Sequence, residues 1–450
     1  MTVALDTSGA FGADRADEKR LIRKVGYRLI PFLGICYFFA YLDRVNLGFA
    51  ALTMNKEFNF TPTVFSIGAG IFFIGYFLFE VPSNIALEKF GARRWIGRIM
   101  ISWGILSALM AYIGGVNSFY TLRFLIGVAE AGFFPGIVLY LTYWFPAEYR
   151  ARILAAFIVA VPLSAAIGSP ISGMLLGLDG VGGMKGWQWL FILEGIPSII
   201  LGLVSVFYLT DGPKNARWLT DAEKSWLTRQ LEKERLAKEN VRKLGFGETI
   251  ANPDIWGLSI IYFGLVAALY GAGFWLPQIV KAFGVTNTQT GFLTAIPYLF
   301  SVVAMIIWSR NSDRSRERIW HVVLPMVLTG LALAASATAQ SPQVVMITLT
   351  LATIGIYAGF ALFWTLPSAI LTGTAAAGGI ALINSIGNLA GFVGPYVVGW
   401  FKETTGDVSS GLMVISVLPL ISAVMVLVFG RFRRRELEAG EGSLGLARDH

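Results

Sequence analysis

Long apolar runs recur along this chain and are separated by short polar segments. Within each run apolar side chains predominate on every face, over about the 20 residues that an α-helix needs to cross the hydrocarbon core of a bilayer. Twelve stretches meet this criterion, and the pattern predicts spans at roughly residues 29–53, 64–87, 95–115, 118–141, 151–178, 188–210, 255–280, 290–309, 319–339, 343–371, 376–401 and 409–430.

The composition argues against a water-soluble protein. Apolar residues make up 55% of the chain and charged residues 14%, whereas an average soluble protein has about 25% charged residues. The mean hydropathy is +0.64. Such a chain has too little polar surface to coat a globule in water, so we expect the bilayer to be its solvent. The predicted fold class is an all-α membrane protein with 12 transmembrane helices.

Several other classes of protein are disfavoured by what the sequence contains. The single cysteine, Cys36, lies within an apolar run, where we expect it to serve packing. Only two histidines are present, His321 and His450, so a histidine metal site is not expected. No Gly-x-Ser-x-Gly motif or phosphate-binding loop occurs, so we expect neither an enzyme nor an ATP-driven pump, and no cofactor.

The basic residues are distributed asymmetrically between the predicted loops. The 36 Lys and Arg residues concentrate on one side of the membrane, which the positive-inside rule makes cytoplasmic together with both termini. The exceptions are four lysines on the other side and two arginines within spans: Lys56, Lys185, Lys281, Lys402, Arg44 and Arg123. The formal net charge of +8 is therefore a topology signal, and we expect no nucleic-acid partner.

The spans divide into two halves that repeat. Residues 211–253 are polar and contain a capping-box pattern, Thr220 to Glu223, ahead of an amphipathic stretch. A related motif follows the second span of each half, with Glu88 five residues before Arg93 and Asp313 five before Arg318. The predicted organisation is a cytosolic tail (1–26), a six-helix bundle (27–210), a cytosolic loop (211–253), a second six-helix bundle (254–432) and a cytosolic tail (433–450).

Several segments carry a family resemblance. They read Tyr-Leu-Asp-Arg-Val-Asn (41–46), Gly-Tyr-Phe-Leu-Phe-Glu-Val-Pro-Ser-Asn (75–84), Arg-Phe-Leu-Ile-Gly-Val-Ala-Glu-Ala-Gly-Phe-Phe-Pro (123–135), Trp-Gln-Trp-Leu-Phe-Ile-Leu-Glu-Gly (187–195) and Asn-Ser-Ile-Gly-Asn (384–388). With the twelve-span layout and the long central loop, the chain resembles the major facilitator superfamily. Within it, the chain resembles the anion:cation symporter (phthalate permease-like) family, which implies symport of an organic anion with protons.

Two departures from the superfamily pattern matter. The loop acid that is usually Asp is Glu88 here, which keeps the charge for a salt bridge. The fifth span has only a fragment of the glycine-proline pattern of antiporters, Gly-Ser-Pro-Ile-Ser-Gly (168–173), and this does not favour drug efflux.

Ionisable side chains gather within the first half. Each costs about 2.5–3.5 kcal/mol at the centre of a bilayer on insertion scales, so we expect them to be functional. They are Asp43, Arg44, Glu80, Arg123, Glu130 and Glu194. The later spans 9–12 have no charge in their cores, so any proton chemistry is expected in the first bundle.

Arg44 is our candidate for binding the anionic group of a substrate, because its planar guanidinium matches a carboxylate. Asp43 and Glu130 are candidates for proton coupling, since burial disfavours an ionised carboxylate and a nearby arginine favours it. Asp43 and Arg44 are adjacent and diverge around the helix axis, so we expect a crossed arrangement of Asp43 with Arg123 and Arg44 near Glu130. The alternative is a four-charge network that only fixes helix packing. The resemblance implies the same roles, with Arg123 as a partner exchanged between the acids.

Polar side chains elsewhere could complete a binding site. Tyr41 shares a helix face with Arg44, and the resemblance places Tyr76 similarly. In the second half, Trp364 and the pair Asn384 and Asn388, one turn apart, would form a neutral wall. The largely apolar and aromatic segment 357–363 indicates a substrate less hydroxylated than a sugar acid.

The remaining acids and the loop motifs have other predicted roles. We expect Glu194 to serve packing or gating rather than proton transfer, while Glu80 is a candidate for a second polar contact. Salt bridges between the bundles would close the cytoplasmic side while the other side is open. Their candidates are Glu88, Arg93, Arg94, Asp313 and Arg318, with Arg150 and Arg152 as further partners.

The predicted function is proton-coupled uptake of a small organic carboxylate (tartrate-, sugar-acid- or aromatic-acid-like) by alternating access. One alternative is an anion exchanger or uniporter without proton coupling, and a transporter-like ligand sensor is less favoured. We expect a monomer without obligate protein partners, multi-pass in a cell membrane such as the bacterial inner membrane. Its partners are the substrate, protons and the lipid bilayer.

Overall fold

The computed structural model describes residues 15–239, 248, 251–370 and 374–446. Within these ranges it leaves out the side chains of 151–152, 155–156, 237–239, 368–370, 374–378 and 431–446. The described chain is built from helices, and 12 of them are long and apolar enough to cross a membrane. The predicted number of spans is therefore confirmed.

The first bundle contains the helices before the central loop. Their bounds are α1 (Arg15–Glu57), α2 (Pro62–Phe90), α3 (Ala92–Leu109), α4 (Val116–Glu130), α5 (Phe133–Thr142), α6 (Ala147–Ile158), α7 (Ala160–Leu175) and α8 (Gly186–Tyr208). After α9 (Asp221–Glu239) come the helices of the second bundle. These are α11 (Pro253–Gly273), α12 (Leu276–Lys281), α13 (Asn287–Ser315), α14 (Ile319–Thr338), α15 (Pro342–Phe363), α16 (Thr365–Ile370), α17 (Thr374–Thr405) and α18 (Val408–Leu446).

The fourth span is broken in its middle, directly after a predicted site residue. α4 ends at Glu130, Ala131 is extended, and Gly132 has a φ of +82° before α5 begins. This left-handed conformation favours glycine. A Cβ at Gly132 would also collide with the Ser83 side chain on α2. Because of this break, Glu130 lies at the C-terminus of a helix in the interior of the bundle.

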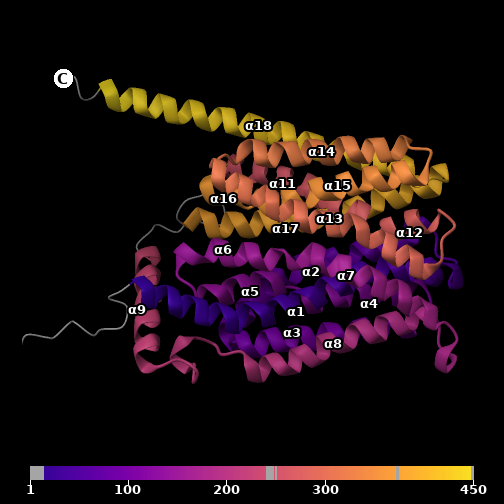
Figure 1. The fold of residues 1–450 in the computed structure, drawn as a ribbon, viewed down its shortest axis with the longest axis horizontal. Coiled ribbons are helices and arrows are strands. Elements are labelled where there is room, and N and C mark those ends of the chain that lie inside the picture. Colours follow the sequence, from indigo (N-terminus) through magenta and orange to yellow (C-terminus); the bar gives the residue numbers. More distant parts are fainter. Residues whose placement is uncertain (1–14, 240–247, 249–250, 371–373, 447–450) are drawn as a thin grey trace, which may run out of the picture.

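Helices pack closely where glycine removes the side chain between them. Within the first bundle α3 contacts α8, where Gly104 and Gly195 lie against each other's backbone, and α2 contacts α4 at Gly75 and Gly127. Figure 1 shows α1–α8 side by side in one bundle and α11–α18 in the other, with the spans nearly parallel. Small residues allow this approach in membrane helices, where dispersion contacts replace the hydrophobic effect.

The two bundles touch each other along two main seams, α2 with α17 and α7 with α13. Most close contacts lie towards the end opposite α9. There Gly291 packs on the backbone of Ser169 and Gly173, and Gly48 approaches the carbonyl oxygen of Phe274. The Thr63 amide also donates to Glu403 at 2.8 Å. The structure is therefore closed between the bundles at this end.

Helix α9 lies across the other end of the first bundle, roughly perpendicular to the spans (Figure 1). The predicted capping box is present, because the Thr220 amide donates to Glu223 at 2.8 Å and the Glu223 amide donates to Thr220 Oγ1 at 3.3 Å. Glu223 also pairs with Lys24 of α1 at 2.7 Å, and Glu234 pairs with Arg150 of α6 at 2.8 Å. Both ends of α9 are thus attached to the first bundle.

Candidate functional site

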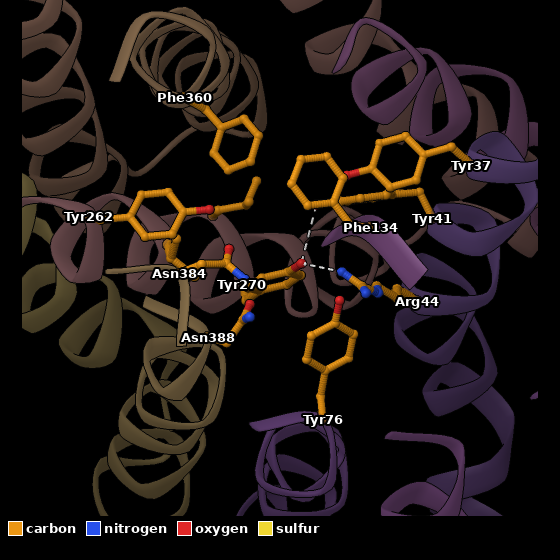
Figure 2. Close-up of a pocket in the computed structure, with 12 residues that line it drawn as sticks. Tyr37, Tyr41, Arg44, Tyr76, Phe134, Tyr262, Tyr270, Phe360, Asn384 and Asn388 are labelled. Atoms are coloured by element: carbon orange, nitrogen blue, oxygen red, sulfur yellow. Dashed lines mark hydrogen bonds between the residues drawn. The ribbon is translucent and has the colours of Figure 1, made fainter. Parts of the chain in front are cut away.

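A pocket lies between the bundles, near the middle of the spans. Figure 2 shows its walls, with Arg44 and tyrosines of the first bundle facing Tyr270 and the amides of the second. The residues that line it are Tyr37, Tyr41, Arg44, Tyr76, Phe134, Tyr262, Val266, Leu269, Tyr270, Phe360, Asn384 and Asn388. Five of the six predicted substrate-binding residues are among them.

Arg44 is the positive charge of the pocket wall. One terminal nitrogen forms an ion pair with Glu130 of α4, and the other donates to the Tyr270 hydroxyl at 3.0 Å. Its Nε has no hydrogen-bond partner. The guanidinium also lies over the rings of Tyr41 and Tyr76, at 5.1 and 5.5 Å from their centroids. The predicted proximity of Arg44 to Glu130 is confirmed, and the guanidinium keeps unused donor capacity.

The second predicted pair, Asp43 with Arg123, is wrong for this conformation. Asp43 is absent from the pocket lining and instead accepts hydrogen bonds from neutral donors, at 2.8 Å from Trp103 Nε1, 3.2 Å from Ser107 and 3.1 Å from Ser198. The physical reason is helical geometry, because adjacent residues diverge by about 100° and cannot both face the pocket. Asp43 therefore points into the first bundle, between α3 and α8.

Arg123 satisfies its charge with backbone oxygens. Its Nε and a terminal nitrogen donate to the carbonyl groups of Gly68 and Ala69 on α2, at 3.1 and 3.4 Å. The guanidinium lies over the Phe72 ring at 5.1 Å. The close packing of α2 on α4 brings these carbonyl oxygens within reach of a buried side chain. Arg123 is 2% exposed, so the pocket does not reach it in this state.

Glu80 proves to be a contact between the bundles. It lies on α2 and is buried, and its two oxygens accept from Asn384 Nδ2 at 2.6 Å and Ser385 Oγ at 3.4 Å, both on α17. The sequence left Glu80 as a possible second polar contact, and the structure assigns it a direct bond to a predicted pocket residue. This bond ties the amide wall of the second bundle to the first bundle.

Trp364 does not line the pocket. Its ring packs against Tyr262 at 4.9 Å in an edge-on arrangement, behind the pocket wall. Tyr262 itself lines the cavity, so Trp364 packs against a pocket residue without lining the pocket.

Several aromatic lining residues were not predicted from the sequence, and Tyr270 is the most consequential of them. Its hydroxyl receives the Arg44 hydrogen bond and lies 3.3 Å from the Tyr41 hydroxyl, which joins the two bundles across the pocket. A signal was available, because Tyr262 and Tyr270 lie eight residues apart, near one face of α11. On the first helix, Tyr37 lies four residues before Tyr41 and shares its face.

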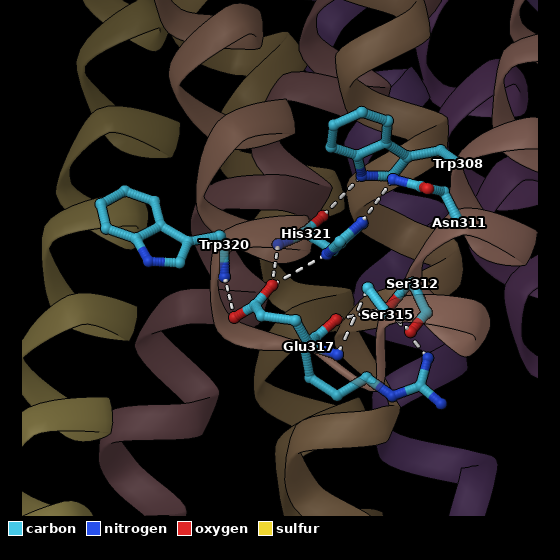
Figure 3. A network of polar contacts seen from close by, with 8 residues as sticks. Trp308, Asn311, Ser312, Ser315, Glu317, Trp320 and His321 are labelled. Atoms are coloured by element: carbon cyan, nitrogen blue, oxygen red, sulfur yellow. Dashed lines mark hydrogen bonds and ion pairs between the residues drawn. The ribbon is translucent and has the colours of Figure 1, made fainter.

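None of the ion pairs that the structure gives for the described side chains of the predicted gating residues joins the two bundles. Arg318 donates to Asp313 at 2.7 Å and to Ser312 at 2.9 Å. Figure 3 shows the surrounding network, in which Glu317 accepts from the Trp320 amide and the His321 ring and so holds the turn between α13 and α14. The turn is thus well ordered by its own polar contacts.

The first-bundle loop shows the same behaviour. Arg93 lies 3.9 Å from Asp211, while Glu88 and Arg94 are exposed. The side chain of Arg152 lies outside those that the structure describes. Because the structure is closed at the opposite end, bridges that would close the α9 end are not expected here, and the predicted switch stays a prediction for the other state.

The comparisons with known proteins agree with this architecture. Residues 33–395 match the model of the Major Facilitator Superfamily. The chain belongs to the major facilitator superfamily. A solved structure of the xylose transporter XylE from E. coli, titled as a partially occluded inward open conformation, superposes with a TM-score of 0.74 at 12% identity, covering 90% of this chain and 98% of the other. This likeness shows the fold of the superfamily.

Two curated relatives are similar to this chain over nearly its whole length. A "Putative tartrate transporter" of Agrobacterium vitis is 51% identical over 421 residues, 94% of each chain. A "Quinolone resistance transporter" of Acinetobacter baumannii is 40% identical over 423 residues, 94% of this chain and 98% of the relative. Both relatives are named as transporters, which together with the family match supports a membrane transporter rather than an enzyme.

Proposed function

We propose that this superfamily member is a proton-coupled symporter that takes up a small organic carboxylate by alternating access. The observation that carries the proposal is the ion pair of Arg44 and Glu130 at the pocket wall. A guanidinium forms strong paired hydrogen bonds with a carboxylate. A substrate carboxylate therefore competes with Glu130 for Arg44. Protonation of Glu130 frees Arg44 for the substrate, and departure of the substrate returns Arg44 to the ionised Glu130.

The position of Glu130 supports proton exchange at this residue. It is the last residue of α4, where the helix dipole places negative partial charge and disfavours an ionised carboxylate. The Arg44 guanidinium offsets this effect as long as the pair is intact. Occupation of Arg44 by the substrate removes the offset, so anion and proton are bound together. The charge in the pocket then changes little during the cycle.

Asp43 supports a second site for a proton. It accepts from two serine hydroxyls as well as from Trp103. A hydroxyl donates to an ionised carboxylate and accepts from a protonated one by rotation alone. Asp43 therefore gains or loses a proton with little rearrangement of the surrounding helices.

The membrane orientation follows from the basic residues. They concentrate at the α9 end, which we assign to the cytoplasm together with both termini, in the bacterial inner membrane. The closed end is then periplasmic, which corresponds to an inward-facing state, and we propose that the protein acts as a monomer. In this state the substrate is released into the cell, which suits uptake.

The substrate class follows from the pocket lining. Arg44 provides the charge complement for one carboxylate, and Asn384, Asn388 and the tyrosine hydroxyls offer neutral hydrogen bonds. The name of the Agrobacterium vitis relative points to tartrate. The aromatic rings of Phe134, Tyr262 and Phe360 also suit aromatic acids. The panel of candidates is therefore tartrate, sugar acids and aromatic acids.

The decisive experiment records substrate-triggered proton entry into liposomes that contain the protein. We expect one acid of the panel to drive proton entry, and Glu130→Gln and Arg44→Ala each to reduce it at least tenfold. Matched controls are Glu148→Gln, an exposed carboxylate, and Arg98→Ala, an arginine outside the pocket. Both controls should retain the signal.

The other results would point to different functions. Exchange of an acid without proton movement would replace symport by anion exchange and make the buried charges structural. Proton movement driven by a quinolone and by none of the acids would favour the function named for the Acinetobacter baumannii relative. The panel therefore includes a quinolone.

A further inference from the structure

A further buried carboxylate, Glu194, lies within the first bundle and outside the pocket. It is on α8 and only 2% exposed. Its Oε1 accepts from Ser172 of α7 at 2.7 Å, whereas its Oε2 has no hydrogen-bond partner. None of the ion pairs found among the described side chains includes Glu194. An ionised carboxylate in this position would be a buried and incompletely bonded charge.

Asn46 connects Glu194 with Asp43. Its Nδ2 lies 3.5 Å from Asp43 Oδ1, and its side chain is also close to Glu194. The Asn46 side chain is fully buried, and its Oδ1 has no partner. Two buried oxygens, Asn46 Oδ1 and Glu194 Oε2, are thus unsatisfied in one neighbourhood. Both are acceptors, so neither satisfies the other while Glu194 is ionised.

A single proton resolves this conflict. Placed on Glu194 Oε2, it donates to Asn46 Oδ1, while Asn46 Nδ2 donates to an ionised Asp43. With the amide rotated by half a turn, Nδ2 donates to an ionised Glu194 and Oδ1 accepts from a protonated Asp43. The two amide orientations fit the same space. Either arrangement satisfies every polar atom with one bound proton, whereas two ionised carboxylates would leave like charges buried together.

We propose that Asp43 and Glu194 share one proton across Asn46, which makes Glu194 a further proton-binding residue of this carrier, beside Glu130 and Asp43. Asn46 transfers no proton itself, and its orientation follows whichever carboxylate is protonated. The inference rests on the proposed proton coupling for its role in transport, although the shared proton itself rests on the geometry alone.

The surroundings of the pair are otherwise neutral or distant. From α3 Asp43 meets Trp103 and Ser107, and from α8 it meets Ser198, one turn from Glu194. From α7, Glu194 meets Ser172. The charged groups of α4 that act on Asp43 through space are Glu130 and Arg123, each engaged with other partners. No closer charge competes with the pair for the proton among these contacts.

Two carboxylates that share a proton hold it more tightly than either does alone. Glu194→Gln removes one like charge and keeps an amide that bonds both Ser172 and Asn46. We therefore expect Asp43 in this variant to release its proton at a pH about one unit lower, a tenfold change in proton concentration. The pH at which uptake is half-maximal should shift to acid by the same amount.

The test combines infrared titration of the full chain in detergent with proton-coupled uptake in liposomes. Wild type should lose a carboxylic-acid carbonyl band at a higher pH than Glu194→Gln or Asp43→Asn does. Ser205→Ala is the matched control, a buried serine of α8 that bonds only within its helix, and should titrate like wild type. Retained ligand binding shows that each variant is folded.

The outcomes separate this inference from the proposed function. Bands and pH profiles that are unchanged in Glu194→Gln would overturn the shared proton and leave Glu194 as a packing residue. A band that depends on Glu194 in a protein without substrate-triggered proton entry would support the shared proton and overturn symport. A shift in both measurements supports the two proposals together.

Discussion

At the scale of single residues, the site depends on which side of a helix each side chain takes. Asp43 and Arg44 are neighbours in sequence, but their side chains have different surroundings. Asp43 points into the interior of the first bundle, whereas Arg44 lines the pocket. Arg44 remains at the pocket because three groups hold it: Glu130, the Tyr270 hydroxyl and the rings beside it. The contacts of Arg44 therefore hold its guanidinium in position at the pocket, where it can bind a ligand.

Tyr270→Phe tests how this arrangement contributes to binding. The change removes the hydroxyl that accepts from Arg44 and contacts Tyr41, and a lost hydrogen bond of this kind costs about 1 kcal/mol. We expect KM for the substrate to rise about fivefold with kcat nearly unchanged, as measured by initial uptake rates. Tyr120→Phe, outside the pocket lining, is the control and should match wild type. A fall in kcat alone would contradict a role of Tyr270 in binding.

At the scale of elements, α9 is positioned by polar contacts with the first bundle. Its amphipathic pattern was readable from the sequence, and Leu227 is fully buried while Trp218 stacks on Trp144 at 5.4 Å. Glu223 serves both as the capping residue of α9 and as the partner of Lys24. Because α9 is tied only to this bundle in the contacts described, we expect it to move with that bundle during transport.

The docking of α9 should depend on the charge of Glu223. Partial burial raises the pKa of Glu223, but the hydrogen bonds from Lys24 and the Thr220 amide hold the pKa below its usual value of 4.5. A lowered folded-state pKa means that the stabilisation is present above pH 4.5 and is lost as the pH falls through the lower, folded-state value. At neutral pH, Glu223→Gln should mimic this loss and speed amide hydrogen exchange in residues 221–236 by about fivefold.

Asp221→Asn provides the matched control for this measurement. Asp221 is almost fully exposed and pairs only with Lys224 of the same helix. Exchange in α9 should therefore stay at the wild-type rate. Equal acceleration in both variants would mean that helix capping charge, and not the Lys24 contact, holds α9 in place.

At the scale of the whole molecule, closure of the end opposite α9 depends on glycines, which have no side chain to separate the two bundles. A Cβ at Gly291 would lie 2.5 Å from the carbonyl oxygen of Ser169 and 3.1 Å from the Cα of Gly173. Backbone cannot yield as a flexible side chain does, so any larger residue must separate α7 from α13. Alternating access by rigid bundles requires this seam to open and close in each cycle.

Gly291→Leu should therefore hold the closed end open and stop transport. The readout is labelling of an introduced Val45→Cys, near the pocket, by a membrane-impermeant thiol reagent added outside. Buried Cys36 gives little background. We expect labelling at least tenfold faster than in the parent protein. Gly114→Leu, at a site with open space around it, should leave labelling slow, and slow labelling in Gly291→Leu would refute this account of closure.

The sequence by itself determined the twelve spans, the two halves and the concentration of charge in the first bundle. These follow from local rules, since the bilayer demands long apolar helices and penalises each buried charge. It also placed Tyr41, Arg44, Tyr76, Asn384 and Asn388 in one pocket, through helical spacing and family resemblance.

Apart from the pairing of Arg44 with Glu130, which the sequence predicted, only the tertiary structure decided how the buried charges pair. Asp43 found neutral donors on α3 and α8, Arg123 found carbonyl oxygens of α2, and Glu80 reached Asn384 across the bundles. These outcomes depend on distances between helices far apart in sequence, which glycines set by letting backbones approach. No periodicity within one helix records which partner a neighbouring helix presents, and so the pairing became visible only with the helices packed.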